Sequence, residues 1–201
     1  NYIRKVFDAF STDDRIEFHM YSNGYNIENM KKVVEYDNCP IDKFSIQISY
    51  DGRIINDLYR LNNAGKTTTD NVMQTFNYLA NKGIKCYFKS TVPNGAENKL
   101  YDTWLNFYDL HQQYKDYKNV NISFSPTLDY SMSSGSNMGA EAALNSFRSE
   151  IIKIAKKEIE FFEENNRHLM SWFAGSNTKT NCSAGLNLSA IGVDGSVYAC
   201  H

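Results

Sequence analysis

Residues 43–52, KFSIQISYDG, decide the fold of this chain because they carry the most regular alternation in the sequence. One face of this stretch is apolar and the other is small and polar: Phe44, Ile46, Ile48 and Tyr50 against Ser45, Gln47 and Ser49. A period of two residues is typical of a β-strand. We therefore predict a strand over residues 43–50, closed at its carboxyl end by the turn pair Asp51-Gly52.

Similar patterns flank this strand on both sides. Alternation predicts further strands over residues 14–22, 84–92 and 119–125, the last one ended by Pro126. Apolar residues at helical spacing predict helices over residues 2–10, 26–36, 69–82, 97–115 and 140–165, and residues 51–66 read as a polar loop. The last helix has its apolar stripe at Leu144, Phe147, Ile151, Ala155, Ile159 and Phe162.

Strands that alternate with helices predict an α/β fold whose parallel strands are joined by right-handed crossovers. Four strands are too few to close a barrel. The sheet is either an open doubly wound sheet or part of a barrel whose first strands lie upstream. Either arrangement places ligands at the carboxyl ends of the strands. These ends are rich in small polar residues: Ser22-Asn23-Gly24, residues 49–52, Ser90-Thr91 and residues 125–129.

The composition restricts the class of protein. The 201 residues suit one domain with the start of a second, and a net charge of −2 excludes the electrostatic footprint of a nucleic-acid-binding protein. No apolar run approaches the roughly 20 residues that a membrane helix needs. Four cysteines without a secretion signal favour a reducing cytoplasm over a disulfide scaffold.

The last residues, 181–201, read NCSAGLNLSAIGVDGSVYACH. Alternating residues on both sides of Asp194-Gly195 predict a β-hairpin that brings Cys182 and Cys200 towards the same end. The chain stops one residue after the second cysteine and begins without a methionine inside a helical pattern. We therefore expect the sequence to be a piece of a longer protein.

Three of these features together resemble the radical S-adenosylmethionine (radical SAM) enzymes with a SPASM domain. They are SNG after one strand, ISYDG after the next, and the terminal Cys-x12-Gly-x4-Cys hairpin, and the likeness runs from Ile16 to His201. The resemblance implies a partial (βα)6 TIM-like barrel, from its third strand onward, over residues 1–170. Residues 171–201 would then begin the SPASM domain with its opening β-hairpin.

The resemblance also implies a function. Members of the family cleave S-adenosylmethionine (AdoMet) at a 4Fe–4S cluster and use the resulting radical to modify a peptide or protein substrate. RiPP-type or sulfatase-type maturation is the expected chemistry, with a reductant such as flavodoxin or ferredoxin as a second partner. The cluster-binding CxxxCxxC motif is absent from these 201 residues, so we expect the chain alone to be inactive. The alternative is a non-catalytic α/β peptide-binding module built on the same scaffold.

Under this resemblance, Cys182 and Cys200 would be ligands of an auxiliary 4Fe–4S cluster. A pair of ordinary thiols, or half of a zinc site, is the alternative. His201 would be the catalytic base at a position where the sulfatase-maturating branch has an aspartate.

The resemblance further places six residues at the AdoMet site. Ser49 would contact the methionine carboxylate and Asp51 the ribose hydroxyls, although Asp51-Gly52 serves a turn in any case. Arg60 could pair with the methionine carboxylate, or it could be a solvated surface arginine. Three more residues complete the predicted contacts: Asn23, which a turn alone would explain, and Lys89 and Thr91, which share one face of their strand.

Overall fold

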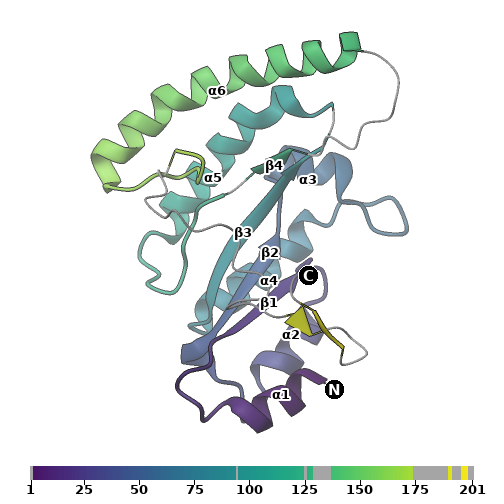
Figure 1. Cartoon of the computed structure of the whole chain (residues 1–201), viewed down its shortest axis with the longest axis vertical. Helices are drawn as coiled ribbons and strands as arrows, with labels where there is room; N and C mark the ends of the chain where they lie inside the picture. The colour runs from purple at the N-terminus through teal and green to yellow at the C-terminus, as the bar shows by residue number, and fades with distance from the viewer. Residues whose placement is uncertain are drawn as a thin grey trace.

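The computed structural model describes residues 2–93, 95–124, 126–128, 137–173, 190–191 and 196–198. Four parallel strands form one sheet in the order β1-β2-β3-β4. Figure 1 shows this sheet at the centre of the molecule. The predicted α/β fold with parallel strands is therefore confirmed, whereas the assignment of this sheet to a partial barrel stays a prediction. The strands are β1 (Phe18–Ser22), β2 (Phe44–Ser49), β3 (Lys85–Val92) and β4 (Pro126–Leu128).

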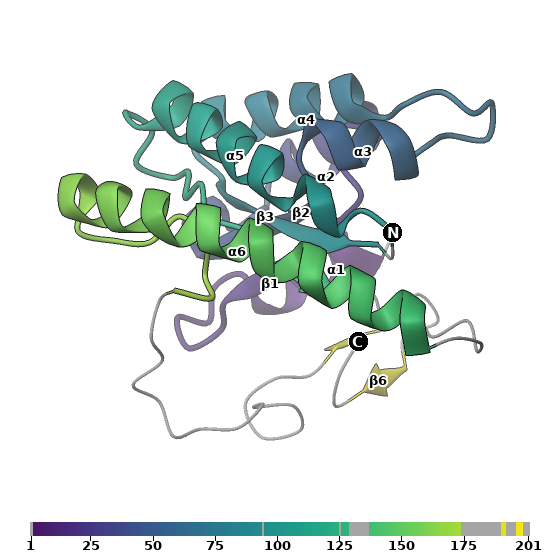
Figure 2. The same cartoon turned by 90° about the horizontal axis from the view of Figure 1, so that it is seen from above.

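The described residues contain all five predicted helices and one more. They are α1 (Tyr2–Phe10), α2 (Ile27–Val34), α3 (Arg53–Tyr59), α4 (Thr69–Asn81), α5 (Leu100–Tyr114) and α6 (Asn137–Asn165), with 3-10 turns at Ile41–Lys43 and Glu97–Lys99. Figure 2 shows α3, α4 and α5 together on one side of the sheet. Within this part of the chain, none of the helices combines the length and apolar character needed to cross a membrane.

The prediction of a polar loop over residues 51–66 is wrong for its first half, which forms α3. Only Ile55 and Asn56 of this helix are buried, while Ile54 and Leu58 are exposed. A helix of seven residues with so narrow a buried face leaves no apolar stripe in the sequence, so periodicity alone could not reveal it.

Two strand boundaries also differ from the prediction. β1 begins at Phe18 rather than at residue 14. β4 begins at Pro126, the residue predicted to end it, and pairs with residues 90–92 of β3. Val120 and Phe124 form only isolated bridges. A proline is tolerated as the first residue of a strand because its missing N–H interrupts no ladder there.

The two faces of the sheet differ as the alternation predicts. Ile46 and Ile48 of β2 are fully buried, and Phe88 of β3 stacks on Phe76 of α4 with ring centroids 4.1 Å apart. These apolar side chains and the helices above them form the core. The opposite face is more polar and more exposed. Residues that are paired across neighbouring strands lie side by side on this face: His19, Ser45 and Lys85; Tyr21, Gln47 and Tyr87; Ser49 and Lys89.

Helix α6 packs beside α5 through two buried carboxylates. Glu150 accepts a hydrogen bond from the backbone N–H of Tyr101 at 2.9 Å, in the first turn of α5. Glu158 is 1% exposed and accepts hydrogen bonds from Trp104 Nε1 at 2.6 Å and the Met170 N–H at 2.8 Å. Since each of these contacts satisfies a donor, the carboxylates join α6 to α5 and to the segment after α6.

The predicted stripe of α6 is correct only in part, since Phe147 and Ile151 pack against the core. Ile154 and Phe161 are buried together with the two glutamates, whereas Leu144, Ile159 and Phe162 are 43%, 60% and 42% exposed. The pattern failed here because buried glutamates count as polar in a sequence and moved the apparent apolar face around the helix.

Strands β5 (Ala190–Ile191) and β6 (Val197–Tyr198) pair antiparallel, as the predicted hairpin requires. The predicted turn at Asp194-Gly195 lies outside the described residues. That this ribbon opens a SPASM domain, and that the domain boundary falls near residue 170, both stay predictions.

The close packing at Gly52 predicts a large effect of a single methyl group. Gly52 has φ +84°, and a Cβ there would lie 2.9 Å from Thr103 Cγ2. We expect Gly52→Ala to lower the free energy of unfolding by more than the about 1–3 kcal/mol of the backbone conformation alone. Gly83→Ala is the control, because Gly83 has φ +78° and no atom within 4 Å of the added Cβ. Equal losses in denaturant titrations of the two variants would contradict this close contact.

A second prediction concerns pH. Arg167 Nη2 donates to His111 Nδ1 at 2.8 Å, so the imidazole must be neutral, and His111 Nε2 lies 3.2 Å from Asn165 Oδ1. Burial lowers the pKa of His111 below its usual 6.5, and the positive charges of Arg167 and Lys115 lower this pKa further. Protonation therefore favours the unfolded chain, and stability falls as the pH drops from 6.5 towards the lower pKa of the folded state.

Denaturant titrations at about pH 7.5 and about pH 5.5 measure this loss of stability. His111→Gln keeps the hydrogen-bonding shape without titrating, so we expect it to reduce the difference between the two pH values. His19→Gln is the control, because the side chain of His19 is 44% exposed. If His111→Gln loses as much stability between the two pH values as the wild type does, the pH dependence does not come from His111.

Candidate functional site

The carboxyl end of β1 is shaped by the sequence Ser22-Asn23-Gly24. Ser22 Oγ accepts a hydrogen bond from the Gly24 N–H at 3.0 Å, and Asn23 Oδ1 accepts one from the Tyr25 N–H at 3.1 Å. Gly24 has φ +66°, and a Cβ there would lie 2.9 Å from Ile48 Cγ2. The glycine therefore lets the chain leave β1 in contact with β2, and the turn presents the Asn23 side chain at this edge.

A buried ion pair occupies the same edge one strand further on. Asp51 follows β2 and is 3% exposed. Its Oδ1 accepts hydrogen bonds from Arg60 Nη2 at 3.0 Å and from the Thr91 N–H at 2.7 Å, and its Oδ2 accepts one from Arg60 Nε. One carboxylate thus joins the end of β2, the end of β3 and the residue that follows α3.

The backbone of Arg60 is held as firmly as its side chain. Its carbonyl oxygen accepts hydrogen bonds from Thr68 Oγ1 at 2.9 Å and from the Thr68 N–H at 3.2 Å. Residues 61–67 form the loop between these two residues, and Asn62 Oδ1 organises its tip by accepting from the N–H groups of Ala64 and Lys66. The guanidinium is therefore a fixed positive charge rather than a mobile one.

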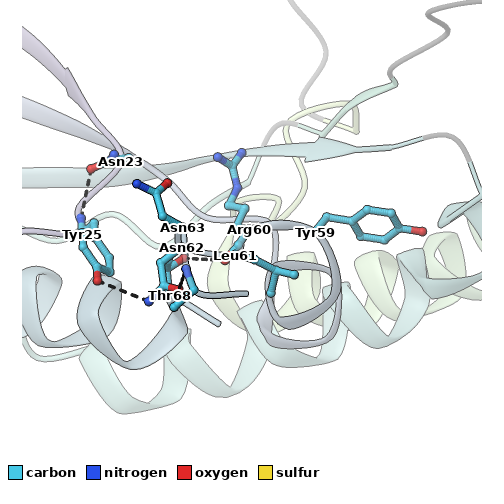
Figure 3. Close-up of a pocket in the computed structure, with 9 residues that line it drawn as sticks. Asn23, Tyr25, Tyr59, Arg60, Leu61, Asn62, Asn63 and Thr68 are labelled. Carbon is cyan, nitrogen blue, oxygen red and sulfur yellow. Dashed lines mark hydrogen bonds between the residues drawn. The ribbon is translucent and has the colours of Figure 1, made fainter. Parts of the chain in front are cut away.

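This fixed charge faces a cavity of about 710 Å³, a size within the usual range for small-molecule sites. Figure 3 shows Asn63 and Arg60 projecting in the same direction from the loop, while the ring of Tyr59 points away from them. The side chain of Arg60 is 31% exposed. Among the described residues, the lining has amides, phenols and one cation but no carboxylate: Asn23, Tyr25, Tyr59, Arg60, Leu61, Asn62, Asn63, Ala64 and Thr68. Such a lining suits an anionic group with polar neighbours.

The structure brings the six residues predicted for AdoMet to one edge of the sheet. Asn23 and Arg60 line the cavity, and Asp51 lies behind Arg60. Ser49 and Lys89 are neighbours in register on the polar face of the sheet. Thr91 supplies a backbone N–H to Asp51. Direct contact of any of them with AdoMet stays a prediction.

Sequence reasoning missed several residues that line the cavity, chiefly Tyr25 after β1, Tyr59 at the end of α3, and Asn62 and Asn63 in the loop. The stretch Asn62-Asn63-Ala64-Gly65 is a turn signal that could have located the tip of the loop. Its relation to β1 could not be read locally, because it depends on a contact between Asn62 Nδ2 and the Tyr25 hydroxyl at 3.5 Å.

The predicted cluster ligands Cys182 and Cys200 and the predicted base His201 lie outside the described residues. In the part of the chain that the structure describes, no group of three or more histidine, cysteine, aspartate or glutamate side chains could hold a metal ion. The two cysteines in that part are free thiols. Burial raises the pKa of the Cys39 thiol to about 11 and that of the Cys86 thiol to about 12, so both are protonated near neutral pH.

No protein-family model matches the sequence, and no curated protein matches it. Solved structures, however, share its fold. Native anSMEcpe with bound AdoMet and Cp18Cys peptide has a TM-score of 0.64 at 16% identity, over 94% of this chain and 52% of that chain. Histidine-tagged anSMEcpe with bound AdoMet has a TM-score of 0.60 at 18% identity, over 87% of this chain and 44% of that chain.

The protein in those structures is a radical SAM/SPASM anaerobic sulfatase-maturating enzyme. This chain shares the fold of part of anSMEcpe. The chain spans about half the length of anSMEcpe. The family resemblance seen in the three sequence motifs is thus supported by the arrangement of the strands and helices that carry the first two of them.

The ion pair predicts a specific loss of stability. Asp51→Asn keeps the size of the side chain but removes the charge that Arg60 and the Thr91 N–H both contact. We expect the free energy of unfolding to fall by about 2–3 kcal/mol, because buried charge-assisted hydrogen bonds are lost. Asp70→Asn is the control, since its side chain is 88% exposed and lies 3.6 Å from Arg53. Denaturant titration measures the free energy of unfolding of both variants. An equally small change in both would contradict the expected contribution of the buried ion pair to stability.

Proposed function

We propose that this chain is the core part of a radical SAM/SPASM enzyme that modifies a peptide or protein substrate. The observation that carries the proposal is the fixed, partly exposed guanidinium of Arg60 in a cavity at the carboxyl ends of the strands. The shared fold supports it, since anSMEcpe binds AdoMet and a peptide.

The residues of the cavity fit AdoMet. Arg60 has two nitrogens on Asp51 and remains 31% exposed, which leaves the guanidinium open to a carboxylate such as that of the methionine moiety. Ser49, Asn23, Lys89 and Thr91 would supply the remaining polar contacts. Asp51 has both oxygens engaged within the protein, so we propose that it serves AdoMet by holding Arg60.

When bound beside a reduced 4Fe–4S cluster, AdoMet supplies a 5′-deoxyadenosyl radical for hydrogen abstraction. The protein's part is to orient the methionine end and to exclude competing partners. Cys182 and Cys200 would supply two of the four ligands of an auxiliary 4Fe–4S cluster, and His201 would accept a proton from the substrate. A flavodoxin or ferredoxin would supply electrons, in the reducing cytoplasm that the cysteine content favours.

Anaerobic reconstitution of the intact protein with iron and sulfide tests the proposal. We expect the absorbance of 4Fe–4S clusters and, with a reductant, the conversion of AdoMet to 5′-deoxyadenosine. If the reconstituted protein forms no cluster and no 5′-deoxyadenosine but binds peptides, the non-catalytic peptide-binding module replaces the enzyme.

The role of Arg60 gives a sharper prediction. Arg60→Lys keeps the charge but loses the planar fork, so we expect the Kd for AdoMet to rise by roughly tenfold or more. Equilibrium dialysis with labelled AdoMet measures this affinity in the reconstituted protein. Arg53→Lys is the matched control, because Arg53 is a nearby exposed arginine at the start of α3 and does not line the cavity. An unchanged Kd in Arg60→Lys would remove Arg60 from the AdoMet site.

A further inference from the structure

The loop that follows Arg60, residues 61–67, is closed by a cluster of hydroxyl and carboxylate groups at its base. Helix α3 leads into this loop and α4 follows it, and the two arms of the loop meet at an antiparallel bridge between Leu61 and Thr67. Three consecutive threonines, residues 67–69, form the returning arm. Chain reversal alone does not require three hydroxyls in a row, so their partners indicate what else they do.

The outer two threonines bind the same carboxylate. The hydroxyls of Thr67 and Thr69 both donate to Asp57 Oδ1, on the last turn of α3. Asn56 Nδ2 donates to Thr69 Oγ1 at 2.8 Å, and both Asn56 and Thr69 are fully buried. The end of α3 and the start of α4 are therefore clamped together by side chains rather than by the backbone alone.

The middle threonine connects this clamp to Arg60. Thr68 lies between the two clamped residues and donates both its hydroxyl and its N–H to the carbonyl oxygen of Arg60. On the other side, the Arg60 N–H donates to the carbonyl oxygen of Asn56 at 2.9 Å. The backbone on both sides of Arg60 is therefore hydrogen-bonded to residues of the clamp. Asp57 thus fixes the position of the Arg60 backbone, while Asp51 fixes the position of the guanidinium.

We propose that Asp57 is a positioning residue for the anion-binding Arg60, acting through Thr67, Thr68 and Thr69. The inference rests on the proposed function, because it assigns the consequence of the clamp to AdoMet binding. Asp57 does not line the cavity, so it acts without touching the bound molecule. An anionic ligand group binds more tightly to a guanidinium that is already ordered, because binding then costs less conformational entropy.

The test uses the intact, reconstituted protein and equilibrium dialysis with labelled AdoMet. We expect Asp57→Asn to raise the Kd roughly tenfold, a coupling typical of residues in one hydrogen-bond network. In an Arg60→Ala background, the same change is expected to have almost no further effect on Kd. Thr69→Val should weaken binding as Asp57→Asn does, and Thr69→Ser, which keeps the hydroxyl, should restore it.

Asp70→Asn is the matched control, since Asp70 is an exposed aspartate on the first turn of α4. A purely structural role would lower the melting temperature of Asp57→Asn but leave its effect on Kd the same with and without Arg60. Additive effects, or an unchanged Kd in Asp57→Asn, would overturn the inference while leaving the proposed function intact. A wild-type protein that binds no AdoMet would instead overturn the proposed function, and the inference with it.

Discussion

The hydrogen bonds and the ion pair of the buried Asp51 carboxylate hold together the edge of the sheet at the carboxyl ends of its strands. Removing a carboxylate from water costs several kcal/mol, which only good partners offset. Here the partners come from separate elements: the guanidinium of Arg60 after α3 and the Thr91 N–H in β3, while Asp51 itself follows β2. Because the charge is compensated only when all three are in place, the ends of β2 and β3 and the start of the loop must assemble together.

The ion pair of Asp51 and Arg60 lies between the hydrophobic core and the cavity. The apolar face of the sheet is buried beneath α3, α4 and α5 and forms part of the hydrophobic core with them. The polar face and the loop are more exposed than this apolar face, so they can carry side chains chosen for recognition. Asp51 stands at the boundary: it is buried with the core, yet it orients an arginine that faces the cavity.

Much of the fold could be predicted from the sequence, because the strands alternate cleanly and the longer helices have apolar faces. The prediction failed where burial was narrow or polar: α3 buries only Ile55 and Asn56, and α6 buries Glu150 and Glu158 among its apolar contacts. At the site, Arg60 and Asn23 were expected from a family resemblance, and the structure places both at the cavity. The clamp of Asp57 and the threonines could not be predicted, because it joins two helices through hydrogen bonds that leave no periodic pattern.

The geometry also explains why a weakly patterned loop can serve as a precise binding element. A loop without internal contacts would lose its conformational entropy only when a ligand binds, and affinity would fall accordingly. In this chain the loop is ordered beforehand by Asn62 at its tip and by Asp57 and Thr68 at its base. The ordering cost is thus met during folding by hydrogen bonds to α3 and α4, so that the cavity presents the positive charge of Arg60 already in place.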